Sequence, residues 1–435
     1  MKKKTGKQSG WLYVASLVVK LAVLLIFIMP HYSQWAERMA HSTYYDDVDY
    51  LNHARCFAES GTLVLPNMKA ESLGDYVPTA FRTPGYPLIL VGLGKLCQWH
   101  PLSMLLVQVV ILSVLPVIAL SILRRKQWPS WPAWLLAFDP LITFMILSFM
   151  TEGWLLVLLL LILRCWLEAD RFHWRILSFL LFGIAILVKP TPQFFAVVFL
   201  VVTLVYYQNR LKTLVAFSIG MLPVVMWMFR NLFVCGIFCI STQTDNAIWA
   251  KYTIEAFKQG VAPSYEFAGA MAKKEGVNLG AMIIDNKFDF KENVKMYIQA
   301  NKLLFIKYHT LGTFRVLFGT AREHVKLAVF AGNPIPFEVA YNGFMIAYYA
   351  LLYGAVILLF RFGYLVDRIT LFSVLFVGYN LAMIGIYAYM CGGGLKRTAF
   401  VPFLYLILAH GATMKGKGWP LGWIAEKFKG LKGEG

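Results

Sequence analysis

Residues 102–126 read LSMLLVQVVILSVLPVIALSILRRK, an apolar run that ends in three consecutive basic residues. A helix of this length crosses a bilayer, because about 20 apolar residues span the hydrocarbon core. Lys and Arg in short loops mark the cytoplasmic side of a membrane. The stretch therefore predicts a membrane span whose C-terminal end faces the cytoplasm.

The composition of the whole chain agrees with a membrane protein. Of 435 residues, 59% are hydrophobic and 15% are charged, whereas soluble domains average about 45–50% and about 25%. This composition excludes a secreted enzyme, a nucleic-acid-binding domain and a disordered scaffold. The net charge of +18 then reflects basic residues on the cytoplasmic side of a membrane and not a nucleic-acid partner.

Apolar runs recur along the chain and predict an all-α polytopic membrane protein with about ten transmembrane helices. They lie at 11–30, 102–123, 130–148, 152–168, 175–189, 191–207, 212–229, 337–360, 369–390 and 398–413.

Basic residues orient these spans. With the N-terminus inside, the cytoplasmic segments hold most of the Lys and Arg of short loops, and the short outer turns hold only Lys189, Lys396 and Arg397. Counting the run 84–99 as a span would place Arg124, Arg125 and Lys126 outside. We therefore interpret 84–99 as an interfacial helix on the outer face.

The topology divides the chain into three parts. Residues 1–229 form an N-terminal transmembrane catalytic module that includes an outer loop, 31–100. Residues 230–336 form an outer-face loop region, with helical periodicity over 291–309 and an amphipathic basic stretch over 311–330. Residues 337–435 hold the C-terminal transmembrane helices and a basic cytoplasmic tail.

The unusual polar residues all fall on the predicted outer face. Each alone has an ordinary explanation, such as a helix cap, a surface arginine or a snorkelling side chain. Together they bring acids and bases to one face, which is a functional hypothesis by default. They are Asp46, Asp47, Asp49, Tyr50, Arg82, Glu152, Lys189, Arg230, Asn231, Asn246 and Arg397. Asp139 lies deeper, where pairing with a buried cation is one option, and it is given no catalytic role.

Carboxylates beside fixed cations, under a lipid-exposed cavity, suit a sugar carried on a polyprenyl phosphate. The cations Arg82, Lys189, Arg230 and Arg397 would hold the phosphate and stabilise it as a leaving anion. A carboxylate, Asp46 or Asp47, would remove the proton from an acceptor hydroxyl. Asp49, Tyr50, Glu152, Asn231 and Asn246 are assigned supporting roles.

The order of these motifs resembles the GT-C superfamily of integral-membrane glycosyltransferases, in the branch of protein O-mannosyltransferases and lipid A aminoarabinose transferases. The matching elements run from Asp46-Asp47 and Tyr50, through Arg82-Thr-Pro-Gly-Tyr-Pro and Thr151-Glu152, to Gly183 to Lys189-Pro190, Arg230-Asn231 and Lys396-Arg397.

The resemblance implies a GT-C fold, a polyprenyl-phosphate-linked sugar donor and inversion at the anomeric carbon, with Asp46 as the base. It also implies a multi-pass protein of the cytoplasmic membrane with an outer-face active site. Lys189 stands where relatives commonly have arginine. Metal use varies among these relatives, which leaves open whether Asp46, Asp47 and Glu152 hold Mg²⁺ or Mn²⁺.

Three other functions remain open at this level, one of them a membrane assembly factor without catalysis, which would not need converging acids and bases. A lipid-linked glycan polymerase or ligase would share the cationic outer face, with less need for Asp46 and Asp47. A lipid or sugar transporter would place its site near the bilayer midplane, often within inverted repeats. The acceptor, whether glycan, lipid or protein, is not indicated by the sequence.

Overall fold

Helices make up nearly all of the described chain. The computed structural model describes residues 2–41, 46–65, 77–80, 82–242, 302–322, 338–360, 367–390 and 397–413, and a few positions between 325 and 335. A single two-stranded antiparallel ladder pairs β1 (Val64–Leu65) with β2 (Val77–Pro78). The predicted all-helical class is confirmed at this coarse level.

The elements of the described chain are helices, helical turns and the two short strands. The first are α1 (Lys2–Val23), a π-helical turn (Leu24–Ile28), a 3-10 turn (Met29–His31), α2 (Tyr32–His41), α3 (Asp46–Ser60), α4 (Gly85–Leu96), α5 (Pro101–Leu112), α6 (Leu115–Arg125), α7 (Trp131–Ala137) and α8 (Pro140–Ile146). The rest are α9 (Thr151–Trp166), α10 (Phe172–Val188), α11 (Phe195–Tyr206), α12 (Arg210–Cys235), α17 (Lys302–Phe318), α19 (Glu338–Leu359), α20 (Arg368–Met390), the 3-10 turn η4 (Arg397–Ala399) and α22 (Val401–Thr413).

Several helices are long and apolar enough to cross a membrane. In the described part of the chain there are four, at Lys7–Met39, Pro101–Arg125, Arg210–Cys235 and Glu338–Leu359. There are five if α8 and α9, bent by 113°, count as one broken span. α10, α11 and α22 are apolar but shorter. Length and composition of the described helices thus give four or five spans, fewer than the ten that the sequence predicts.

The third apolar run, 130–148, folds as two short helices and not as one. Pro140 occupies the first turn of α8, where its missing N–H is tolerated, but a continuous helix through it would be broken. Asp139 caps α8, since its Oδ1 accepts a hydrogen bond from the Ile142 N–H at 2.9 Å. The Asp-Pro pair therefore explains the break.

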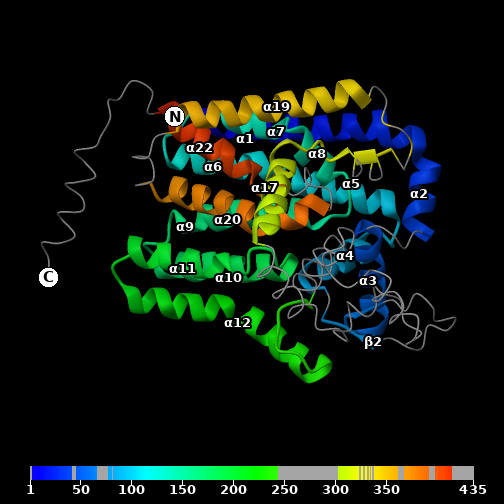
Figure 1. Cartoon of the computed structure of the whole chain (residues 1–435), viewed down its shortest axis with the longest axis horizontal. Coiled ribbons are helices and arrows are strands. Elements are labelled where there is room, and N and C mark those ends of the chain that lie inside the picture. Colours follow the sequence, from blue (N-terminus) through cyan, green and yellow to red (C-terminus); the bar gives the residue numbers. More distant parts are fainter. Residues whose placement is uncertain are drawn as a thin grey trace, which may run out of the picture.

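The segments that the sequence assigns to the cytoplasm contact one another at one end of the bundle. Arg124 donates to Gln8 and Ser9, both at 2.8 Å. Further contacts join Arg125 to Glu168, Lys126 to Asp367 and Arg368 to the Leu167 carbonyl. Figure 1 shows the N-terminus at this end, with α3 and α4 at the opposite end.

The long helices pack side by side along the longest axis of the molecule (Figure 1). α10 contacts α9 and α12, and α22 contacts α19 and α20. Where α10 meets α12, a Cβ on Gly183 would lie 2.5 Å from the Gly220 carbonyl oxygen. Small residues at such a crossing let two backbones approach closely in a membrane.

α17 is the longest described helix that lies wholly within the predicted outer-face loop region, and it is integrated into the bundle. It packs against α20 and α19, and in Figure 1 it crosses the long helices at a steep angle. It includes residues of both predicted stretches, 291–309 and 311–330, and ends at Phe318. Residues 291–301 lie outside the described chain.

Candidate functional site

Helix ends bring some of the predicted polar residues together. Asp46, Asp47 and Asp49 lie in the first turn of α3, and Glu152 lies in the first turn of α9. Carboxylates are favoured there because the N-terminus of a helix carries partial positive charge. Lys189 follows the last turn of α10, where a cation is favoured for the opposite reason.

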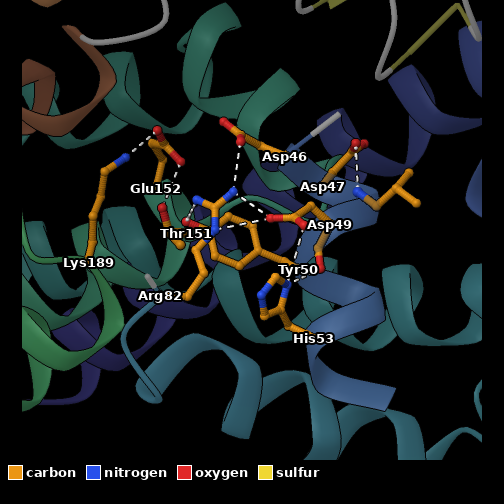
Figure 2. Close-up of polar contacts among 10 residues, drawn as sticks. Asp46, Asp47, Asp49, Tyr50, His53, Arg82, Thr151, Glu152 and Lys189 are labelled. Atoms are coloured by element: carbon orange, nitrogen blue, oxygen red, sulfur yellow. Dashed lines mark hydrogen bonds and ion pairs between the residues drawn. The ribbon is translucent and has the colours of Figure 1, made fainter. Parts of the chain in front are cut away.

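Gly85 fixes how closely two of these helix ends approach. A Cβ at this position would lie 2.7 Å from the backbone of Leu187 and Val188, closer than real atoms come. The start of α4 therefore presses directly on the end of α10. Arg82 lies three residues before Gly85, and Lys189 directly follows Val188. The contact therefore places Arg82 near Lys189 (Figure 2).

Arg82 is the centre of the site (Figure 2). Its Nη2 donates to Asp46 at 3.0 Å and to Asp49 at 2.6 Å, and its Nε donates to Asp49 at 3.1 Å. Its Nη1 donates to the Tyr50 hydroxyl at 2.9 Å, and the guanidinium lies 4.3 Å from the centre of the Tyr50 ring. The side chain is 4% exposed, so the charge of this arginine is buried and compensated by carboxylates.

The two carboxylates on Arg82 differ in exposure. The Asp46 side chain is 50% exposed and the Asp49 side chain 29% exposed. Asp49 also contacts His53, with 3.4 Å between Oδ1 and Nδ1. Burial works to raise the pKa of Asp49, but the charges and hydrogen bonds of Arg82 and His53 outweigh it and hold that pKa well below its usual range. Asp46 is therefore the more accessible acid.

The depressed pKa of Asp49 predicts a pH-dependent contribution to stability. Asp49 stabilises the folded protein above about pH 4, the ordinary value for an aspartate, and the stabilisation is lost as the pH falls toward its folded-state value. In detergent, the difference in thermal unfolding midpoint between wild type and Asp49→Asn should shrink between about pH 6 and about pH 3. A difference in unfolding midpoint that stays constant over this range would show that the charge of the Asp49 carboxylate does not provide the stabilisation.

Asp47 points away from this centre. It pairs in bidentate fashion with Arg38 on α2, with N–O distances of 3.1 and 2.9 Å. Its side chain is 3% exposed, and its Oδ1 also accepts the Val48 N–H at 3.0 Å. The structure thus separates the two adjacent acids that the sequence grouped as catalytic: Asp46 faces Arg82, and Asp47 ties α3 to α2.

Glu152 and Lys189 form a second ion pair beside the first. Lys189 Nζ lies 2.6 Å from Glu152 Oε1, and the Thr151 hydroxyl donates to Oε2 at 3.1 Å. Glu152 is fully buried and Lys189 largely so. The charge of Glu152 also acts on the Tyr50 phenol. Burial raises the pKa of Tyr50 above its ordinary value, so this hydroxyl keeps its proton.

Arg230 and Asn231 lie at the end of α12 and bind backbone. Arg230 donates to the carbonyls of Thr79, at 2.8 Å, and Leu63, at 3.1 Å. Asn231 donates to the Cys239 carbonyl at 2.9 Å. Both hold the segments beside the β-ladder and the turn after α12. Asn246 lies outside the described residues, as does Lys396.

Arg397 is fully buried in η4, apart from the Arg82 centre. Its Nη1 donates to the Leu317 carbonyl, at the end of α17, at 2.7 Å, and its guanidinium lies 3.6 Å from the centre of the Tyr349 ring. Its Nε and Nη2 have no hydrogen-bond partner among the described residues. Among the described residues, these are the only nitrogens of the four predicted phosphate-binding cations that are buried without a hydrogen-bond partner.

Several side chains in these contacts had no signal in the sequence. Arg38, His53 and Tyr349 look like ordinary residues of amphipathic or apolar helices, because nothing local marks their distant partners. Asp139 was visible as a charge inside an apolar run, and its neighbours were not.

The described residues show no group of three or more His, Cys, Asp or Glu side chains placed to hold a metal ion. Asp46, Asp47 and Glu152 do not converge, since each pairs with a different cation. These residues do not fit a shared divalent ion.

No model of a known protein family, no curated protein and no solved structure matches this chain.

Proposed function

We propose that this chain is an integral-membrane glycosyltransferase of GT-C type. It crosses the cytoplasmic membrane about ten times and transfers a sugar from a polyprenyl phosphate to an acceptor hydroxyl on the outer face. The acceptor is a glycan, a lipid or a protein.

The observation that carries the proposal is the half-exposed Asp46 carboxylate, held by buried Arg82. It lies at the end of the bundle opposite the segments rich in basic residues (Figure 1). A solvent-accessible acid fixed beside buried cations suits proton removal next to a phosphate. An assembly factor without catalysis would not need this arrangement.

In the proposed reaction, Asp46 takes the proton of the acceptor hydroxyl. The acceptor oxygen forms a bond to the anomeric carbon from the side opposite the phosphate. The bond between that carbon and the phosphate oxygen breaks, and its electron pair leaves with polyprenyl phosphate as an anion. The configuration at the anomeric carbon is therefore inverted.

The four cations contribute differently to this reaction. Arg82 and Lys189 are neutralised by Asp46, Asp49 and Glu152, and they orient the acids. Arg230 binds backbone carbonyls. Arg397 has two buried donors without a hydrogen-bond partner among the described residues, and η4 packs against α9, the helix that begins with Thr151 and Glu152. We assign the donor phosphate to Arg397.

The test of this function uses the purified full chain in lipid nanodiscs with a panel of polyprenyl-phosphate sugars and acceptors. Wild-type protein should release polyprenyl phosphate and glycosylate one acceptor. Absence of transfer across a broad panel, with uptake of a sugar or lipid into proteoliposomes, would establish a transporter instead.

The proposed topology has its own test in a cysteine-free background. A cysteine at exposed Glu59 should react with an impermeant thiol reagent in spheroplasts, because α3 lies on the outer side. Cysteines at exposed Asp170 and Gln208 should react only after the membrane is permeabilised. Labelling of position 170 in sealed cells, with protection of position 59, would invert the topology.

A further inference from the structure

A fully buried carboxylate, Asp139, joins three parts of the bundle. Its Oδ1 caps α8 at Ile142 and accepts the Tyr349 hydroxyl of α19 at 2.9 Å. Its Oδ2 accepts the Tyr405 hydroxyl of α22 at 2.8 Å. Both oxygens are thus held by neutral donors, and the carboxylate has no direct partner of opposite charge among these contacts.

Two buried cations are close enough for their charges to act on Asp139. They are Lys20 of α1, which donates to Ser16 at 2.7 Å and 3.1 Å, and Arg397. The trio holds two cations and at most one anion, which leaves at least one positive charge without a counter-charge within it. Burying an uncompensated charge is costly, so an anionic ligand bound here would be favoured.

Tyr349 connects the carboxylate to Arg397. Its hydroxyl is held by Asp139, and its ring lies 3.6 Å under the Arg397 guanidinium. The hydrogen bond fixes the orientation of the ring, and the face of an aromatic ring attracts a cation placed over it. The Leu317 carbonyl holds the Nη1 edge of the same guanidinium. Nε and Nη2 are buried and have no hydrogen-bond partner among the described residues.

We propose that Asp139 and Tyr349 are positioning residues that hold Arg397 with Nε and Nη2 presented to the phosphate of the lipid donor. The inference rests on the proposed function, because Arg397 is the phosphate ligand in that reaction. Asp139 and Tyr349 do not touch the donor. They set the plane in which Arg397 offers two parallel hydrogen bonds, the geometry that suits a phosphate.

Tyr405 provides a matched control. It donates to the same carboxylate at nearly the same distance, but its hydroxyl neighbour is Tyr348, at 2.6 Å, and the ring under Arg397 is that of Tyr349. Tyr349→Phe and Tyr405→Phe each remove one hydrogen bond to Asp139 and keep the aromatic ring. Only Tyr349→Phe releases the ring that supports Arg397.

The experiment measures binding of a sugar-free polyprenyl phosphate to the full chain in nanodiscs, with thermal unfolding recorded in parallel. Tyr349→Phe should weaken binding roughly 10-fold, the lower end of the loss of a hydrogen bond to a charged group. Tyr405→Phe should change binding less than about 2-fold. It should lower the unfolding midpoint about as much as Tyr349→Phe does, because each variant loses one hydrogen bond to Asp139. Arg397→Ala removes the proposed phosphate ligand and gives the largest loss of binding expected at this site. Excess inorganic phosphate serves as competitor and shows whether the headgroup alone suffices.

The possible outcomes separate the two proposals. Wild-type protein that binds no polyprenyl phosphate would overturn the proposed function, and this inference with it. If wild-type protein binds polyprenyl phosphate and Tyr349→Phe binds it equally well, only the positioning role is overturned. The same holds if Tyr349→Phe and Tyr405→Phe lose binding equally. Asp139→Asn removes the carboxylate near Lys20 and Arg397, so a loss of binding in this variant could come from misfolding. The comparison of Tyr349→Phe with Tyr405→Phe therefore decides whether the positioning role is correct.

Discussion

Asp46→Asn should lower sugar transfer by about 10²–10⁴-fold, the usual contribution of a general base, while the fold and donor binding persist. Asparagine has nearly the shape of aspartate and still accepts a hydrogen bond from Arg82, but it is a very poor proton acceptor. The assay follows release of polyprenyl phosphate by the purified protein in lipid, with binding of the donor measured on the same samples.

Asp49→Asn is the control for this variant. Asp49 shares Arg82 with Asp46 but is less exposed, and its pKa is held well below the usual range, which makes it a weaker base. We expect Asp49→Asn to reduce stability and to retain more activity than Asp46→Asn. Full turnover by Asp46→Asn, with loss of turnover in Asp49→Asn, would transfer the role of base to Asp49.

The general class of the fold could be predicted from composition and apolar runs, because a helix that crosses a bilayer needs about 20 mostly apolar residues. The positions of most helices followed as well. The exception at 130–148 has a local cause, because Asp139 and Pro140 together end one helix and start another. Hydropathy averages over a window and does not register this break. The steep crossing of α17 depends on contacts with α19 and α20, which no local pattern encodes.

The residues of the candidate site were predictable as a set, but their pairing was not. An acid in the first turn of a helix and a cation after the last turn are visible in the sequence, as with Glu152 and Lys189. Whether an arginine meets carboxylates, as Arg82 does, or backbone carbonyls, as Arg230 does, depends on which segments fold against it. For the same reason, the sequence predicts one catalytic role for Asp46 and Asp47 together, whereas in the structure Asp46 pairs with Arg82 and Asp47 with Arg38.

Asp47→Ala should destabilise the protein by about 3–5 kcal/mol, the usual cost of removing one member of a buried ion pair, because it takes away the carboxylate that pairs with Arg38. The Arg38–Asp47 pair is bidentate and almost fully buried, and it fastens α2 to the first turn of α3. The expected result is a large fall in the thermal unfolding midpoint in detergent. Any loss of transfer should follow the loss of folded protein.

A double variant separates this structural role from a catalytic one. Arg38→Met with Asp47→Leu replaces both charges by apolar groups of similar size, which is often neutral for a buried pair. The double variant should recover most of the stability that Asp47→Ala loses, and transfer per folded molecule should return with it, because Asp46 and Arg82 are untouched. If the double variant folds as well as wild type but transfers no sugar, Asp47 acts in the chemistry, and the separation of the two adjacent acids into a base and a structural anchor is wrong.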